Sequence, residues 1–449
     1  MDDTNLITWG ESAEDNCRRL SAAHERCEAW AKRHGAKFAP DKYQLIHFTR
    51  SRQHACDDLA TSVQIGGHRI EAERKAIRVL GVWLDPKLTW KEHIAQATRK
   101  GLAASEAAAR LAAATWGPSV RNTRLLYTAV IRPAILYGAQ EWSKREAGEK
   151  LPKARISPLE KVQNICLRRI TGGYRRTPRA ALEKEAHVMP LDLYVDARTN
   201  QSILRTQDHP VETSIRNAAE AVWTRMRRAR NQRSRKRRPD TAREATLKRA
   251  KTQAREAGEK LGGAQTRTRQ ARDPHDERGE GQPTLEEGAL VVKGALLDWK
   301  ARWEDQAKHK GARGPATWTA PWEQDRIKLY AGLTKAEATA LFLMRTEVIG
   351  LNAWLASIRV PGILPACECG WRAQTVRHVV LHCPRYERLE LLEHCGTERL
   401  DEMLLQPVSA KHAARWLVRS GAMKQFRVAR EIEREEQELF KSFEKSEAW

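Results

Sequence analysis

The sequence predicts an α+β segment at the N-terminus, a mostly α-helical middle, a basic linker and a small helical C-terminal domain that carries clustered Cys and His residues. Three observations predict this order. Short apolar runs at 42–48, 63–70 and 77–84 have the length of strands. Apolar residues then recur at helical spacing to about residue 200, and the composition changes near residue 215. The expected domains are 1–92, 93–210, 211–289 and 290–449.

Several helix boundaries are marked by capping residues. Residues 12–34 predict an amphipathic helix that Ser12 caps and Gly35 ends. Ser157-Pro158 predicts the start of a helix, because Ser suits the N-cap and Pro the first helical position. Thr334 and Glu337 form a capping box for a helix that ends at Gly350.

Two further signals mark interruptions within elements. Gly66-Gly67 predicts a turn inside the 63–70 strand candidate. Pro133 predicts a kink in the helix that Ser119 opens, because proline removes one helical hydrogen bond.

The net charge indicates a polyanionic partner. The 449 residues include 80 Lys and Arg against 57 Asp and Glu, which gives a net charge of +23 and a pI of about 9.9. This excess argues against a metabolic enzyme with a small neutral substrate and favours nucleic acid first and an acidic membrane surface second. Apolar residues make up 41% of the chain, which is enough for packed cores.

The number of Cys residues and the N-terminal sequence indicate the cellular compartment of the protein. Eight Cys residues in 449 do not form a disulfide scaffold, which favours a reducing compartment. The start Met1-Asp2-Asp3 lacks the basic region of a secretory signal, and no run of 18 apolar residues occurs. We therefore expect an intracellular, nuclear protein without a membrane partner.

About half of the excess charge lies in one segment. Residues 225–255 hold 14 Lys and Arg against 2 Asp and Glu. This density suits sequence-tolerant phosphate contacts, since few aromatic residues interleave for base stacking. A nuclear localisation signal and a solvated linker are the alternatives. The candidate nucleic-acid-binding residues are Arg225, Arg227, Arg228, Arg230, Arg233, Arg235, Lys236, Arg237 and Arg238.

A second constellation has the spacing of a metal site. Cys367 and Cys369 are followed by His378 and Cys383, and three thiolates with one imidazole bind Zn²⁺ tetrahedrally. We expect a structural zinc ion here, and the alternative is a reduced cluster without metal. Nearby rival or reserve ligands are His382, His394 and Cys395.

Several motifs occur in an order that resembles a known family. They are Asp2-Asp3, Phe38–Lys42, Val79–Ile94, Arg121–Trp142 and Leu159–Gly173. Their order resembles the end of the palm and the thumb of a LINE-type (non-LTR retrotransposon) reverse transcriptase. The Cys/His segment also resembles the C-terminal motif of such elements.

The resemblance implies a palm remnant, a helical thumb, a basic linker that is disordered or helical, and a Cys3His zinc motif. It implies that Asp2 and Asp3 are catalytic carboxylates that bind Mg²⁺ and that Leu80 and Gly81 form the primer grip. The implied activity is RNA-directed DNA polymerisation, a nucleotidyltransferase reaction. The implied partners are RNA and DNA as template and primer.

The chain departs from the family pattern because only Met1 precedes the Asp-Asp pair. Two-metal catalysis needs carboxylates from more than one strand to set the spacing of the ions. We therefore expect a truncated polymerase that binds nucleic acid and does not polymerise alone, with Mg²⁺ bound only where an upstream palm and fingers polypeptide completes the site. The alternative is a non-enzymatic, zinc-containing nucleic-acid-binding protein derived from such an element. Either would act in the nucleus or in a cytoplasmic ribonucleoprotein.

Three motifs can each be interpreted in a second way. The segment around Leu80 and Gly81 could be an ordinary core strand, and both interpretations can hold together. By analogy Lys42 could donate a proton to pyrophosphate, but an ordinary exposed lysine is favoured. A tryptophan group predicts a small core in preference to base stacking. Its members are Trp299, Trp303, Trp318 and Trp322.

Overall fold

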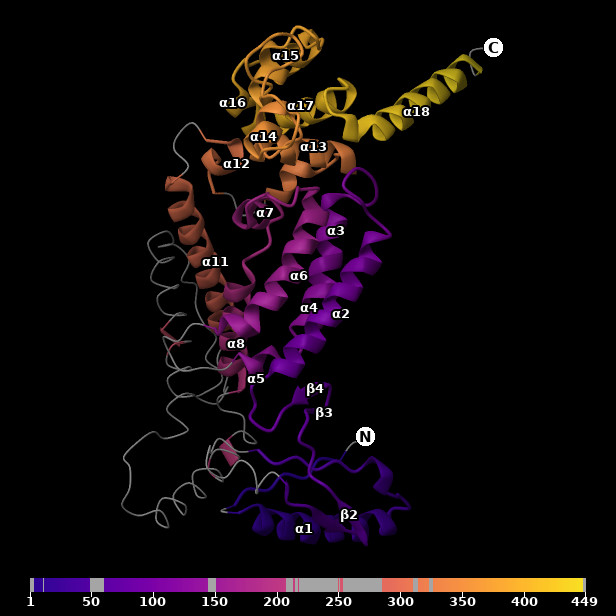
Figure 1. Cartoon of the computed structure of the whole chain (residues 1–449), viewed down its shortest axis with the longest axis vertical. Coiled ribbons are helices and arrows are strands. Elements are labelled where there is room, and N and C mark those ends of the chain that lie inside the picture. Colours follow the sequence, from indigo (N-terminus) through magenta and orange to yellow (C-terminus); the bar gives the residue numbers. More distant parts are fainter. Residues whose placement is uncertain are drawn as a thin grey trace, which may run out of the picture. The chain divides into compact units, whose positions relative to one another are not determined.

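The structure is a computed structural model, drawn in Figure 1. By residue contacts the chain forms two compact units, each gathered from three sequence segments, and the expected domain boundaries stay predictions. Unit 1 contains Met1–Ala97, Tyr137–Arg155 and Asp196–Val292, and unit 2 contains Thr98–Leu136, Ile156–Val195 and Lys293–Trp449. The described residues are 4–10, 12–48, 60–143, 151–206, 213–214, 217, 249, 251–252, 285–309, 314–322 and 326–446.

Unit 1 contains the strands of the described chain. Its elements are α1 (Ala13–Arg33), the 3₁₀ turn η1 (Pro40–Lys42), β1 (Val63–Ile65), β2 (His68–Ile70), β3 (Ile77–Val79), β4 (Val82–Leu84) and α5 (Ala139–Trp142). Four helices pass from one unit into the other along the chain: α2 (Lys91–Ala109), α6 (Lys153–Thr171), α8 (Leu191–Thr206) and α11 (Leu285–Lys308).

The predicted first helix is confirmed as α1. The Ser12 side chain accepts a hydrogen bond from the Asp15 N–H at 3.1 Å, and Gly35 follows the last turn with a φ of +70°. The helix packs against β1, side by side with the first hairpin in Figure 1. This small core contains Cys17, Leu45 and Val63.

Two strand candidates fold as antiparallel hairpins. Residues 63–70 form β1 and β2 around Gly66 and Gly67, both with positive φ, so the predicted turn is confirmed. Residues 77–84 form β3 and β4, with a tight turn that the sequence did not predict. The third candidate, 42–48, is wrong as a strand, because only Leu45 pairs, in an isolated bridge to Ala72.

Unit 2 is helical among the residues that the structure describes, and no helix in the described chain is long and apolar enough to cross a membrane. Its further elements are α3 (Val120–Leu126), the π turn η3 (Tyr127–Ile131), α4 (Arg132–Ile135), α7 (Arg179–Glu185), α12 (Ala316–Thr319), η4 (Arg326–Tyr330), α13 (Lys335–Thr346), α14 (Asn352–Ser357), the π turn η5 (His378–His382), α15 (Leu389–Cys395), α16 (Leu400–Leu405), α17 (Pro407–Arg419), η6 (Lys424–Phe426) and α18 (Arg427–Ser446).

Helices α2, α3 with α4, and α6 lie side by side (Figure 1). The buried Tyr127 hydroxyl donates to Gln163 on α6 at 2.5 Å, which fixes η3 against α6. The π turn η3 ends two residues before Pro133, which lies in the first turn of α4. The kink predicted at Pro133 stays a prediction.

The start of α6 differs from the prediction. The helix begins at Lys153, so Ser157 and Pro158 lie inside it and do not cap it. Burial of Ile156 in this extra turn explains the difference, because apolar packing outweighs a local capping preference.

Helix α13 is the centre of the C-terminal part of unit 2. Thr334 and Glu337 form the predicted capping box, and all 12 residues of the helix are buried. The helix ends at Thr346, earlier than predicted, because Glu347 takes a left-handed conformation with a φ of +54°. Helix α17 contacts α13, α15 and α16.

The tryptophan group forms a core, as predicted. Trp303 and Trp318 stack with ring centroids 4.4 Å apart and planes within 6° of parallel, and both are buried. Trp299 is also buried and meets the half-buried Trp322 edge to face at 4.9 Å. The ammonium of Lys184 lies 4.1 Å from the Trp303 ring centroid, a favourable cation–π geometry.

A fully buried ion pair joins α7 to α13. Arg345 donates to both carboxylate oxygens of Glu185, with a shortest distance of 2.9 Å, and neither side chain is exposed. The Tyr330 hydroxyl and the Thr317 hydroxyl also donate to this carboxylate, at 2.6 and 2.8 Å. Arg345 donates further to the carbonyl of Leu404. The pair is therefore hydrogen-bonded on both sides, as a buried charge pair requires.

Replacing Arg345 with Met should lower the free energy of unfolding by about 3–5 kcal/mol, because it leaves the Glu185 carboxylate buried and unpaired. The double variant Arg345→Met, Glu185→Gln should recover part of that loss, since the amide carries no charge. Denaturant unfolding of the purified chain measures both. An equal loss in the single and double variants would contradict this explanation.

Burial raises the pKa of Glu183 to about 8, with Arg179 opposing and Asp192 adding to the shift. Since this pKa is raised on folding, its contribution to stability is complete below the unfolded value of about 4.3 and is lost as the pH rises through about 8. We predict that Glu183→Gln flattens the decline in unfolding free energy between about pH 4.5 and pH 8, by on the order of a few kcal/mol. Glu106→Gln, at an exposed position, should leave the decline unchanged.

Candidate metal centre

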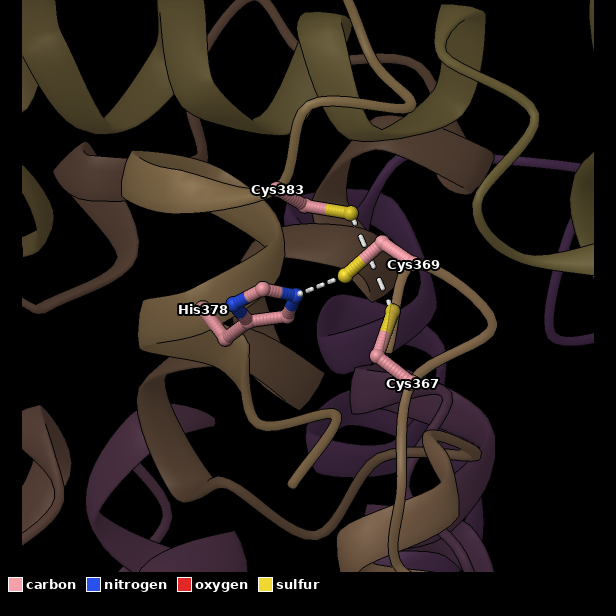
Figure 2. Close-up of side chains that lie close together, drawn as sticks. All are labelled: Cys367, Cys369, His378 and Cys383. Atoms are coloured by element: carbon pink, nitrogen blue, oxygen red, sulfur yellow. Dashed lines mark hydrogen bonds between the residues drawn. The ribbon is translucent and has the colours of Figure 1, made fainter. Parts of the chain in front are cut away.

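The structure brings Cys367, Cys369, His378 and Cys383 together. Their ligand atoms all lie within 4.8 Å of one another, and Figure 2 shows the side chains converging. The Sγ atoms of Cys367 and Cys383 are 3.8 Å apart, and the Cys369 Sγ lies 3.2 Å from the His378 Nε2. The described part of the chain therefore contains a Cys3His cluster that could hold a metal ion.

The distances fit tetrahedral coordination. Metal–sulfur bonds of about 2.3 Å and metal–nitrogen bonds of about 2.0 Å place tetrahedral ligand atoms about 3.5–3.8 Å apart. The Cys367–Cys383 distance already has this value, and the Cys369–His378 distance needs to lengthen by a few tenths of an ångström. All four ligand atoms already lie within 4.8 Å of one another, so they are gathered closely enough to surround one ion.

A tight turn presents the first two thiols. The Cys367 N–H donates to the Trp371 carbonyl at 2.8 Å, and the Gly370 N–H donates to the Cys367 carbonyl at 2.9 Å. Gly370 has a φ of +92°, which a residue with a Cβ rarely adopts. The turn places the Cys367 and Cys369 thiols at the same cluster.

A π turn presents the other two ligands. In an α-helix, residues five apart point about 140° away from each other. In η5 the Cys383 N–H donates to the His378 carbonyl at 2.7 Å, a bond between residues five apart. The wider turn brings the His378 and Cys383 side chains to the same side while Val379, Val380 and Leu381 stay buried.

The protonation equilibria of the cluster residues have opposing effects on the binding of a cation. Burial lowers the pKa of His378, so its imidazole is neutral at pH 7 and can bind a metal. Burial raises the pKa of the Cys383 thiol to about 11, whereas the Trp371 N–H lowers the pKa of Cys369. Metal binding must displace the Cys383 proton and therefore weakens as the pH falls.

The rival ligands lie outside this cluster. The His382 side chain is exposed. The Cys395 thiol is buried and donates to the Ser409 carbonyl at 3.5 Å. The His394 ring lies against the His412 ring in a tilted arrangement, with centroids 4.8 Å apart and planes 32° apart.

The candidate primer grip is the turn of the β3–β4 hairpin. Leu80 has a φ of +47° and is 66% exposed, and Gly81 has a φ of +86°. The Tyr137 hydroxyl donates to the Leu80 carbonyl at 2.8 Å, and a Cβ on Gly81 would lie 3.0 Å from the Tyr137 ring. The aromatic ring therefore supports the turn and leaves Leu80 accessible.

His93 ties the same hairpin to Tyr137. The Trp83 N–H donates to Nδ1 of His93 at 3.3 Å, and Nε2 lies 3.0 Å from the Tyr137 carbonyl. Because Nδ1 accepts, the proton of the neutral ring lies on Nε2 and is donated to Tyr137. Both interpretations of the hairpin remain open, since this is a packed element that presents an accessible turn.

Other predicted residues lie elsewhere. Asp2 and Asp3 and the nine basic residues from Arg225 to Arg238 lie outside the described residues. Lys42 ends η1 with an exposed side chain, as expected for an ordinary lysine.

Sequence analysis missed three residues that shape these sites. Trp371 is stacked on His378, and its place after Cys369-Gly370 was an available signal. His93 and Tyr137 support the hairpin from 44 residues apart, and no local pattern links them.

No protein-family model, no curated protein and no solved structure matches this chain. The resemblance to LINE-type reverse transcriptases stays a prediction from the sequence.

We predict that the purified chain binds one divalent metal ion and that Cys383→Ser lowers the content below about half an equivalent, because one of four ligands is lost. Cys395→Ser is the matched control, since this buried thiol lies outside the cluster and should leave the content unchanged. Elemental analysis after gel filtration measures both. Full metal content in Cys383→Ser would contradict the assignment.

Proposed function

We propose that this chain is the C-terminal portion of a LINE-type reverse transcriptase and that it binds RNA and DNA on a helical unit structured by zinc. The Cys3His cluster carries the proposal, because it agrees with the family motif in both residue types and spacing. The net charge of +23 supports a polyanionic partner.

Zinc is the ion that best suits the cluster. Thiolates with an imidazole in tetrahedral geometry favour Zn²⁺ over Mg²⁺ or Ca²⁺, which prefer oxygen. All four positions come from protein side chains, and three of them are buried, so the site has the character of a closed structural site. The ion would hold the Cys367–Trp371 turn against η5 and would supply no catalysis.

Nucleic acid would meet exposed cationic and apolar groups. Arg175 and Arg176 are exposed just beyond the end of α6, where Arg175 lowers the pKa of Arg168 after the larger effect of burial. The Arg168 guanidinium donates to the carbonyls of Asn164, Tyr174 and Arg175, which leaves the exposed Arg175 and Arg176 as the candidates for binding phosphates. In unit 1, the exposed Leu80 on its supported turn would contact the primer backbone.

We propose that this chain binds RNA and DNA but does not polymerise nucleotides by itself. Two adjacent carboxylates, Asp2 and Asp3, do not by themselves set the spacing of two Mg²⁺ ions. We propose that they would serve as magnesium ligands only together with further carboxylates. The second candidate function is a non-enzymatic, zinc-containing nucleic-acid-binding protein derived from the same kind of element, and the Cys3His cluster supports it equally. A primer-extension assay on an RNA template tests the absence of polymerisation, since nucleotide incorporation above background would contradict both candidate functions as stated.

The proposal predicts strongly salt-dependent binding. The slope of log K against log salt for a fluorescent template–primer should be about −4 or steeper, a loss of roughly 100-fold or more between about 50 and 200 mM salt. Changing Arg235, Lys236, Arg237 and Arg238 to Gln should make the slope shallower by about 3. Changing the three arginines to Lys keeps the charge and should keep the slope.

Fluorescence anisotropy measures these affinities. Salt-independent binding, or no binding at 50 mM salt, would contradict the proposed function.

A further inference from the structure

An exposed indole lies beside the metal cluster. Trp371 is 52% exposed, and its ring stacks on the His378 imidazole with centroids 5.6 Å apart and planes within 2° of parallel. His378 is itself buried and is one of the four cluster residues. The Trp371 ring therefore stacks against a candidate metal ligand, while about half of the residue's surface remains accessible to solvent.

The backbone of the ligand turn fixes this indole. The Trp371 carbonyl accepts from the Cys367 N–H at 2.8 Å, so the residue belongs to the same turn that presents two thiols. A side chain held in this way loses little conformational entropy when a planar ligand stacks on it. An ion in the cluster would make the turn and the His378 ring more rigid still.

Exposed guanidinium groups accompany the indole in sequence. Arg372 follows it directly, and Arg377 precedes His378. Within the described part of the chain, no ion pair involves either group. Arg385 pairs with Glu368, which offsets the carboxylate charge between the two thiols. The neighbourhood of Trp371 therefore combines an aromatic face with net positive charge.

We infer that Trp371 is a stacking platform for an unpaired base of a single-stranded nucleic acid, with Arg372 and Arg377 neutralising the adjoining phosphates. Stacking on an aromatic ring suits any base, because each base has a π face, whereas the bases of a duplex are already stacked on one another. This inference rests on the proposed function and names its preferred ligand at one surface.

Photo-crosslinking tests the inference on the unmodified, metal-loaded chain. An oligodeoxynucleotide of about 12 residues with 5-iodouracil at alternate positions should crosslink to Trp371, as mapped by mass spectrometry of tryptic peptides. Crosslinks confined to other residues would overturn it. The proposed function is tested by a different result, since it would be contradicted by absent or salt-independent binding of the template–primer.

Affinities of substituted variants for oligo(dT) test the inference quantitatively. Trp371→Ala should weaken binding of oligo(dT) about tenfold or more, whereas Trp371→Phe should retain most of the affinity. Trp116→Ala is the matched control, because that indole is 53% exposed and lies outside the metal cluster. Equal affinities for Trp371→Ala and Trp116→Ala, at equal metal content, would also overturn the inference. Arg372→Ala and Arg377→Ala should each make the salt slope shallower by about 1.

Discussion

The ion pair between Glu185 and Arg345 joins parts of unit 2 that are 160 residues apart in sequence. Two fully buried charges are stable only when their remaining hydrogen-bonding groups are also satisfied, and Tyr330, Thr317 and the Leu404 carbonyl do this. Neighbouring lysines follow the same principle. Lys184 donates to the Thr317 and Ala320 carbonyls, and Lys335 donates to the Arg169 and Ile170 carbonyls at the end of α6. Helix α7 and the end of α6 are therefore joined to the C-terminal part of unit 2 by buried polar contacts.

The candidate metal centre also lies in unit 2. Its four ligands come from two short, irregular turns of the backbone. One is a glycine-dependent turn, and the other is a π turn. Each of these two turns positions two ligand atoms through hydrogen bonds between residues that are close in sequence. A bound ion would then connect the two turns and fix Trp371, which touches both through Cys367 and His378. The proposed structural role of the cluster and the proposed recognition role of Trp371 would thus fall on residues in direct contact.

The parts of the structure that the sequence predicted depend on short-range chemistry. The Ser12 cap, the Thr334–Glu337 capping box and the Cys3His spacing all act within about 16 residues, so a local pattern suffices. The misses have tertiary causes. Burial of Ile156 extends α6, and residues 42–48 find no neighbouring strand beyond one bridge. The contact of Tyr137 with Leu80 spans 57 residues and could not be read from either segment.

The interleaving of segments has a consequence for biosynthesis. Unit 2 draws on early and late parts of the chain, so it cannot complete its core until the segment that begins at Lys293 has been synthesised. At about 5–20 residues per second, Glu185 would emerge roughly 8–30 s before its partner Arg345. During that interval the apolar faces of α6 and α7 lack their final covering. This chain is therefore expected to depend on chaperones more than a protein of similar size built from sequentially contiguous domains.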